Sequence, residues 1–231
     1  MLEFLQTMHW GAVFQIILID ILLGGDNAVV IALACRNLPA KQRMQGILWG
    51  TAGAIFLRVV LIAFALTLLG IPFLKLVGAL LLAWIGIKLM MPDDGDHGNI
   101  KGSASIWSAV KTIIIADFVM SLDNVIAIAG AAQNADPDHQ LGLVIFGVVV
   151  SVPIIVWGST LVLKLIDRFP FVVTIGAGLL GWIAGGMLLT DVVVVEHFGV
   201  QPWTVKLAVE VASALLVVGV GYLLGKRKKQ V

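Results

Sequence analysis

Long hydrophobic runs, separated by short polar connections, follow one another along the whole chain. Each run is about 18 to 25 residues long, which is enough for a helix to cross a hydrocarbon core of roughly 30 Å. Prolines stand in the connections or at the starts of runs, where a helix tolerates a residue without an N–H group, and only Pro153 lies inside a run. The pattern predicts seven transmembrane helices, near residues 11–34, 43–69, 72–91, 106–131, 141–166, 170–190 and 203–225.

The composition leaves little chain for anything but membrane segments. Of the 231 residues, 60% are hydrophobic and only 13% are charged, which is unlike an ordinary soluble domain. The first ten residues contain Glu3 and no Lys or Arg, so they lack the basic start of a cleaved secretory signal. We therefore expect residues 1–231 to form one all-α membrane protein domain in contact with the lipid bilayer, with no nucleic-acid partner.

The positive charges divide the predicted connections into two groups. An odd number of spans places the termini on opposite sides, and the cluster Lys226, Arg227, Lys228 and Lys229 then assigns the C-terminus to the cytoplasm. The opposite connections are poor in cations and contain acidic residues such as Asp138 and Asp191. The N-terminus is therefore expected outside. The remaining cations of the cytoplasmic connections and their flanks are Arg36, Lys41, Arg43, Lys88, Lys101, Lys111, Lys164 and Arg168.

A motif in the first span recurs in the fourth. Residues 20–27 read Asp-Ile-Leu-Leu-Gly-Gly-Asp-Asn, and residues 117–124 read Asp-Phe-Val-Met-Ser-Leu-Asp-Asn. Since three spans repeat as three spans, the copies enter the membrane from opposite faces. The predicted fold class is a 3+3 inverted repeat, with copies near residues 11–91 and 106–190, plus a seventh helix at 203–225. Transporters of this plan commonly bind substrate near the midplane, between the two halves.

Four aspartates fall inside predicted spans, and a carboxylate at bilayer depth costs roughly 2.5 to 3.5 kcal/mol. Packing alone is a weak reason for such a cost. Asp20 and Asp26 would point about 120° apart on a continuous helix, so a break at Gly24 and Gly25 is needed to turn both toward one cavity. In the second copy, any unwinding must be milder or supported by the Ser121 hydroxyl.

Carboxylate, amide and backbone carbonyl oxygens form a hard donor set suited to Mn²⁺, Mg²⁺ or Ca²⁺. The absence of paired Cys or His residues argues against a site built for Zn²⁺ or Cu⁺. Several ionised carboxylates around one divalent cation would leave excess negative charge, so exchange of metal for protons is a natural consequence. The candidate metal ligands are Asp20, Asp26, Asn27, Asp117, Asp123 and Asn124.

Two further charged residues lie within predicted spans. Arg58, near the middle of the second span, could be a counter-ion of the site or take part in a pairing unconnected with transport. Glu210 lies about two turns into the seventh span and could extend the ion path, or stand near the surface if the boundary is shifted. The spacings Gly46-x-x-x-Gly50 and Gly181-x-x-x-Gly185 favour packing inside the bundle over dimerisation, which leaves a homo-oligomer open.

With Gly-Gly-Asp-Asn in the first span and Ser-Leu-Asp-Asn in the fourth, the chain resembles the TerC family of bacterial integral membrane proteins. The resemblance covers nearly the whole chain, and its short form is similar to the YjbE and YkoY branch. Membership implies an inner-membrane protein of manganese efflux or of metal supply to exported enzymes, with a historical association with tellurite resistance. It implies no resident cofactor, since Mn²⁺ is the transported ion, and it maps the metal site onto the six ligands named above.

Two other functions compete with a transporter. An intramembrane aspartyl protease needs two membrane aspartates, but Leu23-Gly24-Gly25-Asp26 is not the Gly-x-Gly-Asp such enzymes use, and duplicated Asp-Asn sites exceed one acid–base pair. We therefore do not expect an enzyme. The chain could instead be a metal-delivery subunit of a membrane complex, which flux through liposomes containing only this protein would separate from autonomous transport.

Overall fold

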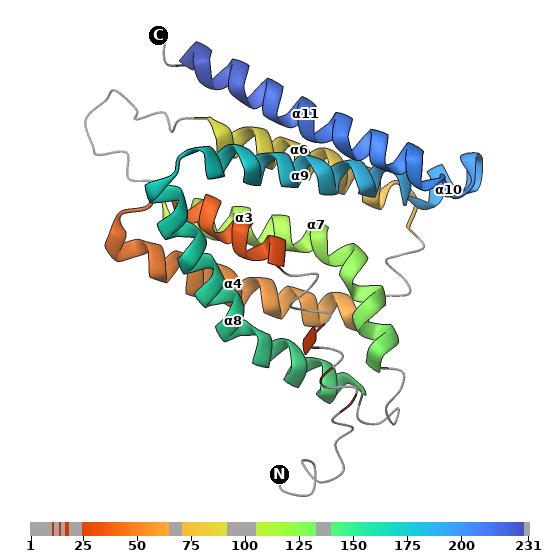
Figure 1. Cartoon of the computed structure of the whole chain (residues 1–231). Helices are drawn as coiled ribbons and strands as arrows, with labels where there is room; N and C mark the ends of the chain where they lie inside the picture. Colours follow the sequence, from red (N-terminus) through yellow and green to blue (C-terminus); the bar gives the residue numbers. More distant parts are fainter. Residues whose placement is uncertain are drawn as a thin grey trace, which may run out of the picture.

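The computed structural model describes residues 25–64, 71–91, 105–132 and 140–228, together with the helical positions Gly11, Phe14, Ile17 and Leu18. All regular structure in this part of the chain is helical (Figure 1). The helices are α3 (Gly25–Cys35), α4 (Ala40–Ala63), α6 (Leu74–Met90), α7 (Ile106–Ala132), α8 (Gln140–Arg168), α9 (Phe171–Leu189), α10 (Val192–Phe198) and α11 (Trp203–Lys228).

The helices follow the predicted spans closely. Helix α6 occupies the predicted 72–91 segment, α9 the 170–190 segment, and α8 continues through Pro153 as expected. Within the described residues, four helices are long and apolar enough to cross a membrane, at Ala40–Ile62, Ile145–Arg168, Phe171–Leu189 and Trp203–Arg227. The all-helical membrane class is thus confirmed, while seven spans and the inverted repeat stay predictions.

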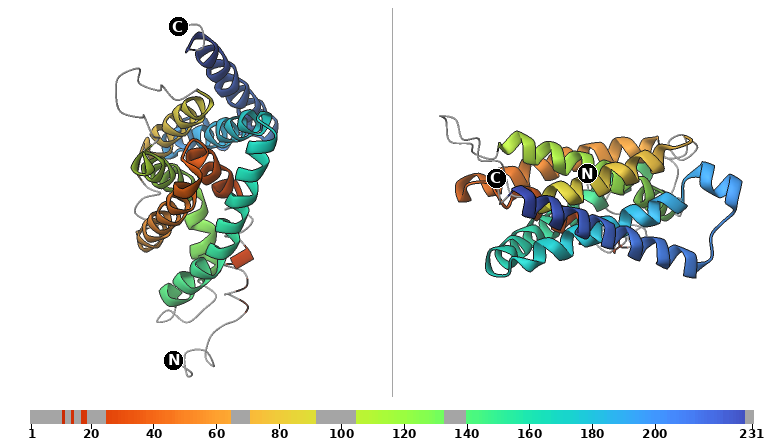
Figure 2. Two further views of the ribbon diagram at one scale, coloured as in Figure 1. Left: turned by 90° about the vertical axis from the view of Figure 1, so that its left-hand side faces the viewer. Right: turned by 90° about the horizontal axis from the view of Figure 1, so that it is seen from above.

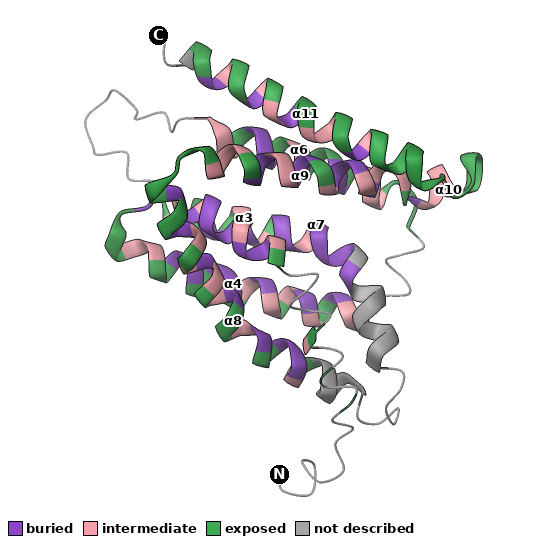
Figure 3. Cartoon of the chain, in the orientation of Figure 1, coloured by how far each residue is buried: buried purple, intermediate pink, exposed green. Residues whose placement is uncertain are grey.

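The outside of the bundle is rich in large apolar side chains. Phe56 of α4, Trp157 of α8 and Leu215 of α11 are all exposed, and α11 is buried along one side only (Figure 3). Such a surface would be unfavourable in water, because extended apolar patches on soluble proteins are small. In a bilayer the same side chains contact lipid tails.

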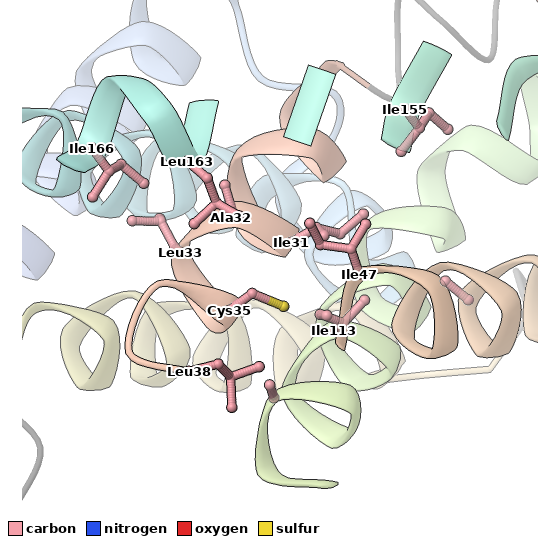
Figure 4. Close-up of a cluster of buried hydrophobic side chains, with 12 residues drawn as sticks. Ile31, Ala32, Leu33, Cys35, Leu38, Ile47, Ile113, Ile155, Leu163 and Ile166 are labelled. Atoms are coloured by element: carbon pink, nitrogen blue, oxygen red, sulfur yellow. The ribbon is translucent and has the colours of Figure 1, made fainter. Parts of the chain in front are cut away.

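The bundle is held together by specific helix pairs. Helix α4 packs on α7, α3 packs on α8, α6 packs on α9, and α11 lies against both α9 and α6 (Figures 1 and 2). Between α3, α4, α7 and α8 lies a cluster of buried side chains that includes Ile31, Ile47, Ile113 and Leu163 (Figure 4). Because lipid is as apolar as these side chains, the cluster stabilises the fold through close packing rather than removal from water.

Glycines allow α9 and α11 to approach at backbone distance. A Cβ atom added at Gly181 would lie 2.8 Å from the Ala214 Cα atom, and one added at Gly185 would lie 2.8 Å from the Glu210 Cα atom. The small-residue spacing of α9 therefore serves packing inside the bundle, as predicted. Gly50 does the same for α4, where an added Cβ would collide with the Ile113 side chain of α7.

One end of the bundle gathers the α3–α4 connection, the α8–α9 connection and the end of α11 (Figures 1 and 2). Arg43 of α4 joins two of these. Its guanidinium donates to the carbonyls of Arg36 (2.8 Å) and Leu38 (3.2 Å), and it forms an ion pair with Asp167 of α8 at 2.6 Å. The cations assigned above to one side of the membrane at residues 36, 43 and 168 thus do lie at one end.

The opposite end contains the short helix α10, where the sequence predicts a connection with acidic residues. Asp191 begins it, and its carboxylate is fully buried rather than solvated. Oδ1 accepts from the backbone N–H groups of Phe73 (3.2 Å) and Val193 (3.0 Å), while Oδ2 accepts from those of Lys75 (3.1 Å) and Leu76 (3.2 Å). One side chain therefore caps both α6 and α10, because helix N-termini leave such donors without intrahelical partners.

Candidate functional site in the membrane interior

The second copy of the motif lies on α7, which is helical without interruption through Ser121 and Leu122. The unwinding considered for this copy therefore does not occur. Asp117 follows the first residue of α7 by eleven positions, about 16 Å along the helix at 1.5 Å per residue. Only 4% of Asp117 is exposed, and Asn124 is buried as well. This arrangement places a carboxylate deep in the bundle, far from either helix end.

Arg58 of α4 is the direct partner of Asp117. The guanidinium Nη2 donates to Asp117 Oδ1 at 2.5 Å, and Arg58 itself is 3% exposed. Its Nε donates to the Ser121 hydroxyl at 3.3 Å, and that hydroxyl donates to Asp117 Oδ2 at 3.2 Å. The three side chains form a closed network in which both carboxylate oxygens of Asp117 accept a hydrogen bond.

The surroundings of this network are apolar. Leu61 and Phe118 pack together beside it, and Ala116, Val119 and Met120 of α7 belong to a second buried cluster with α6 and α9. Removing two charges from water is costly, and their attraction offsets that cost only with good geometry and further hydrogen bonds. The Ser121 hydroxyl supplies one such bond. The chain thus has a charged pair at a position where apolar residues of similar volume would also pack.

Asp26 and Asn27 of the first copy lie at the start of α3, and Asp26 is within electrostatic range of this network. Arg58 and Asp117 both lie close enough to the Asp26 carboxyl to act on it electrostatically. Asn27 beside it is only 2% exposed, and within the described residues neither its amide oxygen nor its amide nitrogen has a hydrogen-bond partner. Asp26 Oδ1 is equally buried without such a partner there. Buried polar atoms are nearly always paired, so this group needs an explanation.

Some of the predicted ligands cannot be placed. Asp20 lies outside the described residues, and the same holds for the side chain of Asp123. Among the side chains that are described, no group of three or more acidic, His or Cys residues stands at metal-binding separation. The sixfold ligand set therefore stays a prediction. Of its members, Asp26 and Asp117 lie within electrostatic range of each other.

Glu210 lies elsewhere, in the interface between α9 and α11. Glu210 is buried, and its Oε1 atom lies 3.7 Å from the Lys206 ammonium. A Cβ atom added at Gly186 would lie 2.9 Å from the same oxygen. This gives Glu210 a cationic partner and a packing position beside the α9 glycines. Its membership of an ion path stays a prediction.

The sequence named Arg58 as a possible counter-ion of the aspartates, and the structure pairs it with Asp117, but the hydroxyl residues nearby were not predicted. Ser121 was considered only as support for an unwound turn, although its i, i+4 spacing from Asp117 on a helix places both on one face. Thr51 of α4, buried with its hydroxyl unpaired in the described part of the chain, was not considered at all. A search for hydroxyl residues on the same helices as the charged ones would have found both.

Comparison with known proteins covers almost the entire sequence. Residues 5–230 match the family described as the integral membrane protein TerC family. YjbE, an uncharacterized membrane protein of Bacillus subtilis (strain 168), is 46% identical over 173 residues, which are 75% of this chain and 77% of that protein. YceF, an uncharacterized membrane protein of the same organism, is 26% identical over 78% of this chain and 71% of its own length.

A longer relative matches over part of its length only. The inner membrane protein YoaE of Escherichia coli (strain K12) is 28% identical over 75% of this chain, which corresponds to 36% of YoaE. No solved structure matches the chain. The relatives thus agree on an integral membrane protein, and their names state no substrate.

Proposed function

Because this chain belongs to the TerC family of integral membrane proteins, we propose that it transports divalent metal cations and exports Mn²⁺ from the cytoplasm. The observation that carries the proposal is the meeting of the two motifs. Arg58 forms a buried ion pair with Asp117 of the second copy, and both residues lie within electrostatic range of Asp26 of the first copy. Charged groups inside a membrane bundle are costly and mark ion pathways by default.

The unpaired oxygens of the first motif support a ligand for this region. Asp26 Oδ1 and the Asn27 side-chain oxygen are buried acceptors without a partner among the described residues. Both are hard oxygen donors, which suit Mn²⁺, Mg²⁺ and Ca²⁺. The sixfold set of Asp20, Asp26, Asn27, Asp117, Asp123 and Asn124 would complete the coordination. Its softest member is an amide oxygen, and for that reason we favour Mn²⁺ over Zn²⁺ or Cu⁺.

The packing pairs support two inverted halves. If α3, α4 and α6 correspond to α7, α8 and α9, exchanging the halves converts the α4–α7 pair into the α8–α3 pair and leaves the α6–α9 pair unchanged. All three pairs are present. In such a plan both motifs face the interface of the halves, where rocking of one half against the other opens the site to each side in turn.

We further propose that the end carrying Arg36, Arg43 and Arg168 faces the cytoplasm, with the N-terminus outside. The excess of Lys and Arg at the connections of this end supports the assignment. A metal-binding site reached from this end would collect cytoplasmic Mn²⁺.

The protease alternative is not supported by the geometry. An aspartyl protease requires two carboxylates that share a proton, whereas both oxygens of Asp117 are held by Arg58 and Ser121. The metal-delivery alternative is tested by the same assay as transport, because a delivery subunit alone would not move metal across a liposome membrane.

The test is Mn²⁺ entry into liposomes that contain only the purified protein and an enclosed Mn²⁺-quenched dye. Asp26→Asn is the decisive variant, since Oδ1 has no described hydrogen-bond partner and the change alters the charge with almost no change of shape. We expect the initial rate to fall at least about tenfold, as for other losses near a metal site. Glu196→Gln, on exposed α10, is the matched control. No flux with the wild-type protein, or full flux with Asp26→Asn, would reject the proposal.

A further inference from the structure

We propose that Arg58 is a built-in substitute for the transported cation: it occupies Asp117 whenever the metal does not, and so lets this carboxylate return without taking up a proton. This inference rests on the proposed transport function and deepens it by naming how the site is reset. It concerns the network of Arg58, Asp117 and Ser121, in which all three side chains are buried.

Arg58 and a divalent cation cannot share Asp117. Oδ1 accepts from Arg58 Nη2 at 2.5 Å, and Oδ2 accepts from the Ser121 hydroxyl, which Arg58 Nε also contacts at 3.3 Å. A metal ligand lies roughly 2.0 to 2.6 Å from its ion for Mg²⁺ or Ca²⁺, so metal on either oxygen would stand beside the guanidinium. Two cations at that separation in an apolar environment repel strongly. Binding of the metal therefore requires Arg58 to leave.

The ion pair keeps the charge of Asp117 compensated when no metal is bound. With Arg58 on Asp117 the pair is neutral, and it remains so at any physiological pH because a guanidinium keeps its proton. Without such a cation, Asp117 would cross the membrane interior as an uncompensated carboxylate each time the carrier returned. Proton uptake, the reset that the charge count alone suggested, becomes unnecessary at this residue.

The position of Arg58 fits a group that moves between two partners. Asp26 of α3 belongs to the first copy of the motif, and Asp117 of α7 belongs to the second. Arg58 forms an ion pair with Asp117 and lies within electrostatic range of Asp26. Its long side chain comes from α4, the helix packed directly on α7. In this proposal, movement of the Arg58 side chain releases Asp117.

Two transport assays distinguish a substitute cation from a merely structural ion pair. In equilibrium exchange, radioactive ⁵⁴Mn²⁺ outside liposomes exchanges for unlabelled Mn²⁺ inside, and the carrier crosses loaded in both directions. In net uptake into Mn²⁺-free liposomes, it must return without metal. A reset role affects only the second assay, whereas a role in folding affects both.

The experiment compares wild type, Arg58→Gln, Arg58→Lys and the surface control Arg168→Gln in both assays. We expect Arg58→Gln to retain exchange within about threefold and to lose net uptake by at least about tenfold, since the return step loses its compensating charge. Arg58→Lys, which keeps a cation, should recover part of the net uptake, and Arg168→Gln should change neither rate.

Equal net uptake by Arg58→Gln and wild type would overturn the inference. Parallel loss of exchange and net uptake in both Arg58 variants would also overturn it, in favour of a structural pair. Absence of exchange in the wild-type protein is a different result, because it rejects the proposed transport function itself.

Discussion

Arg58 and Asp117 are 59 positions apart in sequence, yet the guanidinium of the first donates to the carboxylate of the second in a part of the bundle where each is less than 5% exposed. The pair connects α4 to α7, the helix that carries the second copy of the motif. Its charges are not used to solubilise the chain or to anchor a helix end. Stability and transport make different demands on the pair, and the difference can be measured.

Breaking this pair on one side should be more damaging than removing it. Asp117→Leu leaves the buried Arg58 without this carboxylate, and we expect a loss of about 3 to 5 kcal/mol in the free energy of unfolding. The double variant Arg58→Met with Asp117→Leu removes both charges and should recover most of that loss while remaining inactive in transport. Thermal unfolding in detergent of wild type, both single variants and the double variant forms the required cycle. Strictly additive losses would contradict a direct interaction.

Asn27 should behave in the opposite way. Because neither polar atom of its side chain has a described partner, replacing it with the similarly sized Leu should leave the unfolding temperature unchanged or raise it. We expect Mn²⁺ affinity in the same variant to fall at least about tenfold, as the loss of a nearby ligand does elsewhere. Calorimetric titration with Mn²⁺ and thermal unfolding provide the two readouts, with exposed Asn37→Leu as control. A lower unfolding temperature with normal affinity would assign Asn27 to packing instead.

The helices could be predicted from the sequence because hydrophobic length and breakers are local properties. Pro170 directly precedes α9 and Pro39 precedes α4, and these residues fixed the predicted boundaries within a few positions. The short helix α10 was not predicted, because its seven residues are too few for a transmembrane span or a periodic hydrophobic pattern. The Asp at position 191 was its one local signal, as a residue type that favours helix N-caps.

The site could be predicted only as a set of residues. Four aspartates at membrane depth are visible in the sequence, but the partner of each depends on how the helices rotate and tilt against one another. The pairing of Arg58 with Asp117 arises from the contact between α4 and α7, and the capping of α6 by Asp191 spans more than a hundred positions. Neither contact can be inferred from hydrophobic periodicity, which reports only local structure.

Asp191 is expected to be a stability residue without influence on the metal. Its carboxylate satisfies four backbone N–H groups of α6 and α10, so Asp191→Ala should cost about 1 to 3 kcal/mol in unfolding free energy. Asp191→Asn keeps one acceptor oxygen and should cost less. The unfolding temperature of both variants, measured beside Glu196→Gln, checks the order. Mn²⁺ affinity should be unchanged in all three, and a large shift in affinity would contradict a purely structural role.

The α9–α11 contact should tolerate no side chain at Gly181. A Cβ atom there would lie 2.8 Å from the Ala214 Cα atom and from the Ser213 carbonyl oxygen. Because both are backbone atoms, the helices must move apart, and we expect Gly181→Ala to cost about 1 to 3 kcal/mol. Gly219→Ala on α11, where nothing lies within 4 Å, is the matched control and should leave stability unchanged or raise it. Chemical denaturation in detergent measures both variants, and equal stability would show that the contact yields easily.

Sidedness can be tested with single cysteines, because the native Cys35 is fully buried and free. Asn37→Cys stands in the α3–α4 connection, beside the cations that the positive-inside rule assigns to the cytoplasm, and Glu196→Cys stands on α10 at the opposite end. In intact cells a membrane-impermeant maleimide should label Glu196→Cys and should reach Asn37→Cys only after permeabilisation. The unaltered protein, with Cys35 alone, sets the background. The reverse labelling pattern would place α10 in the cytoplasm and would contradict both the proposed orientation and the proposed direction of Mn²⁺ transport.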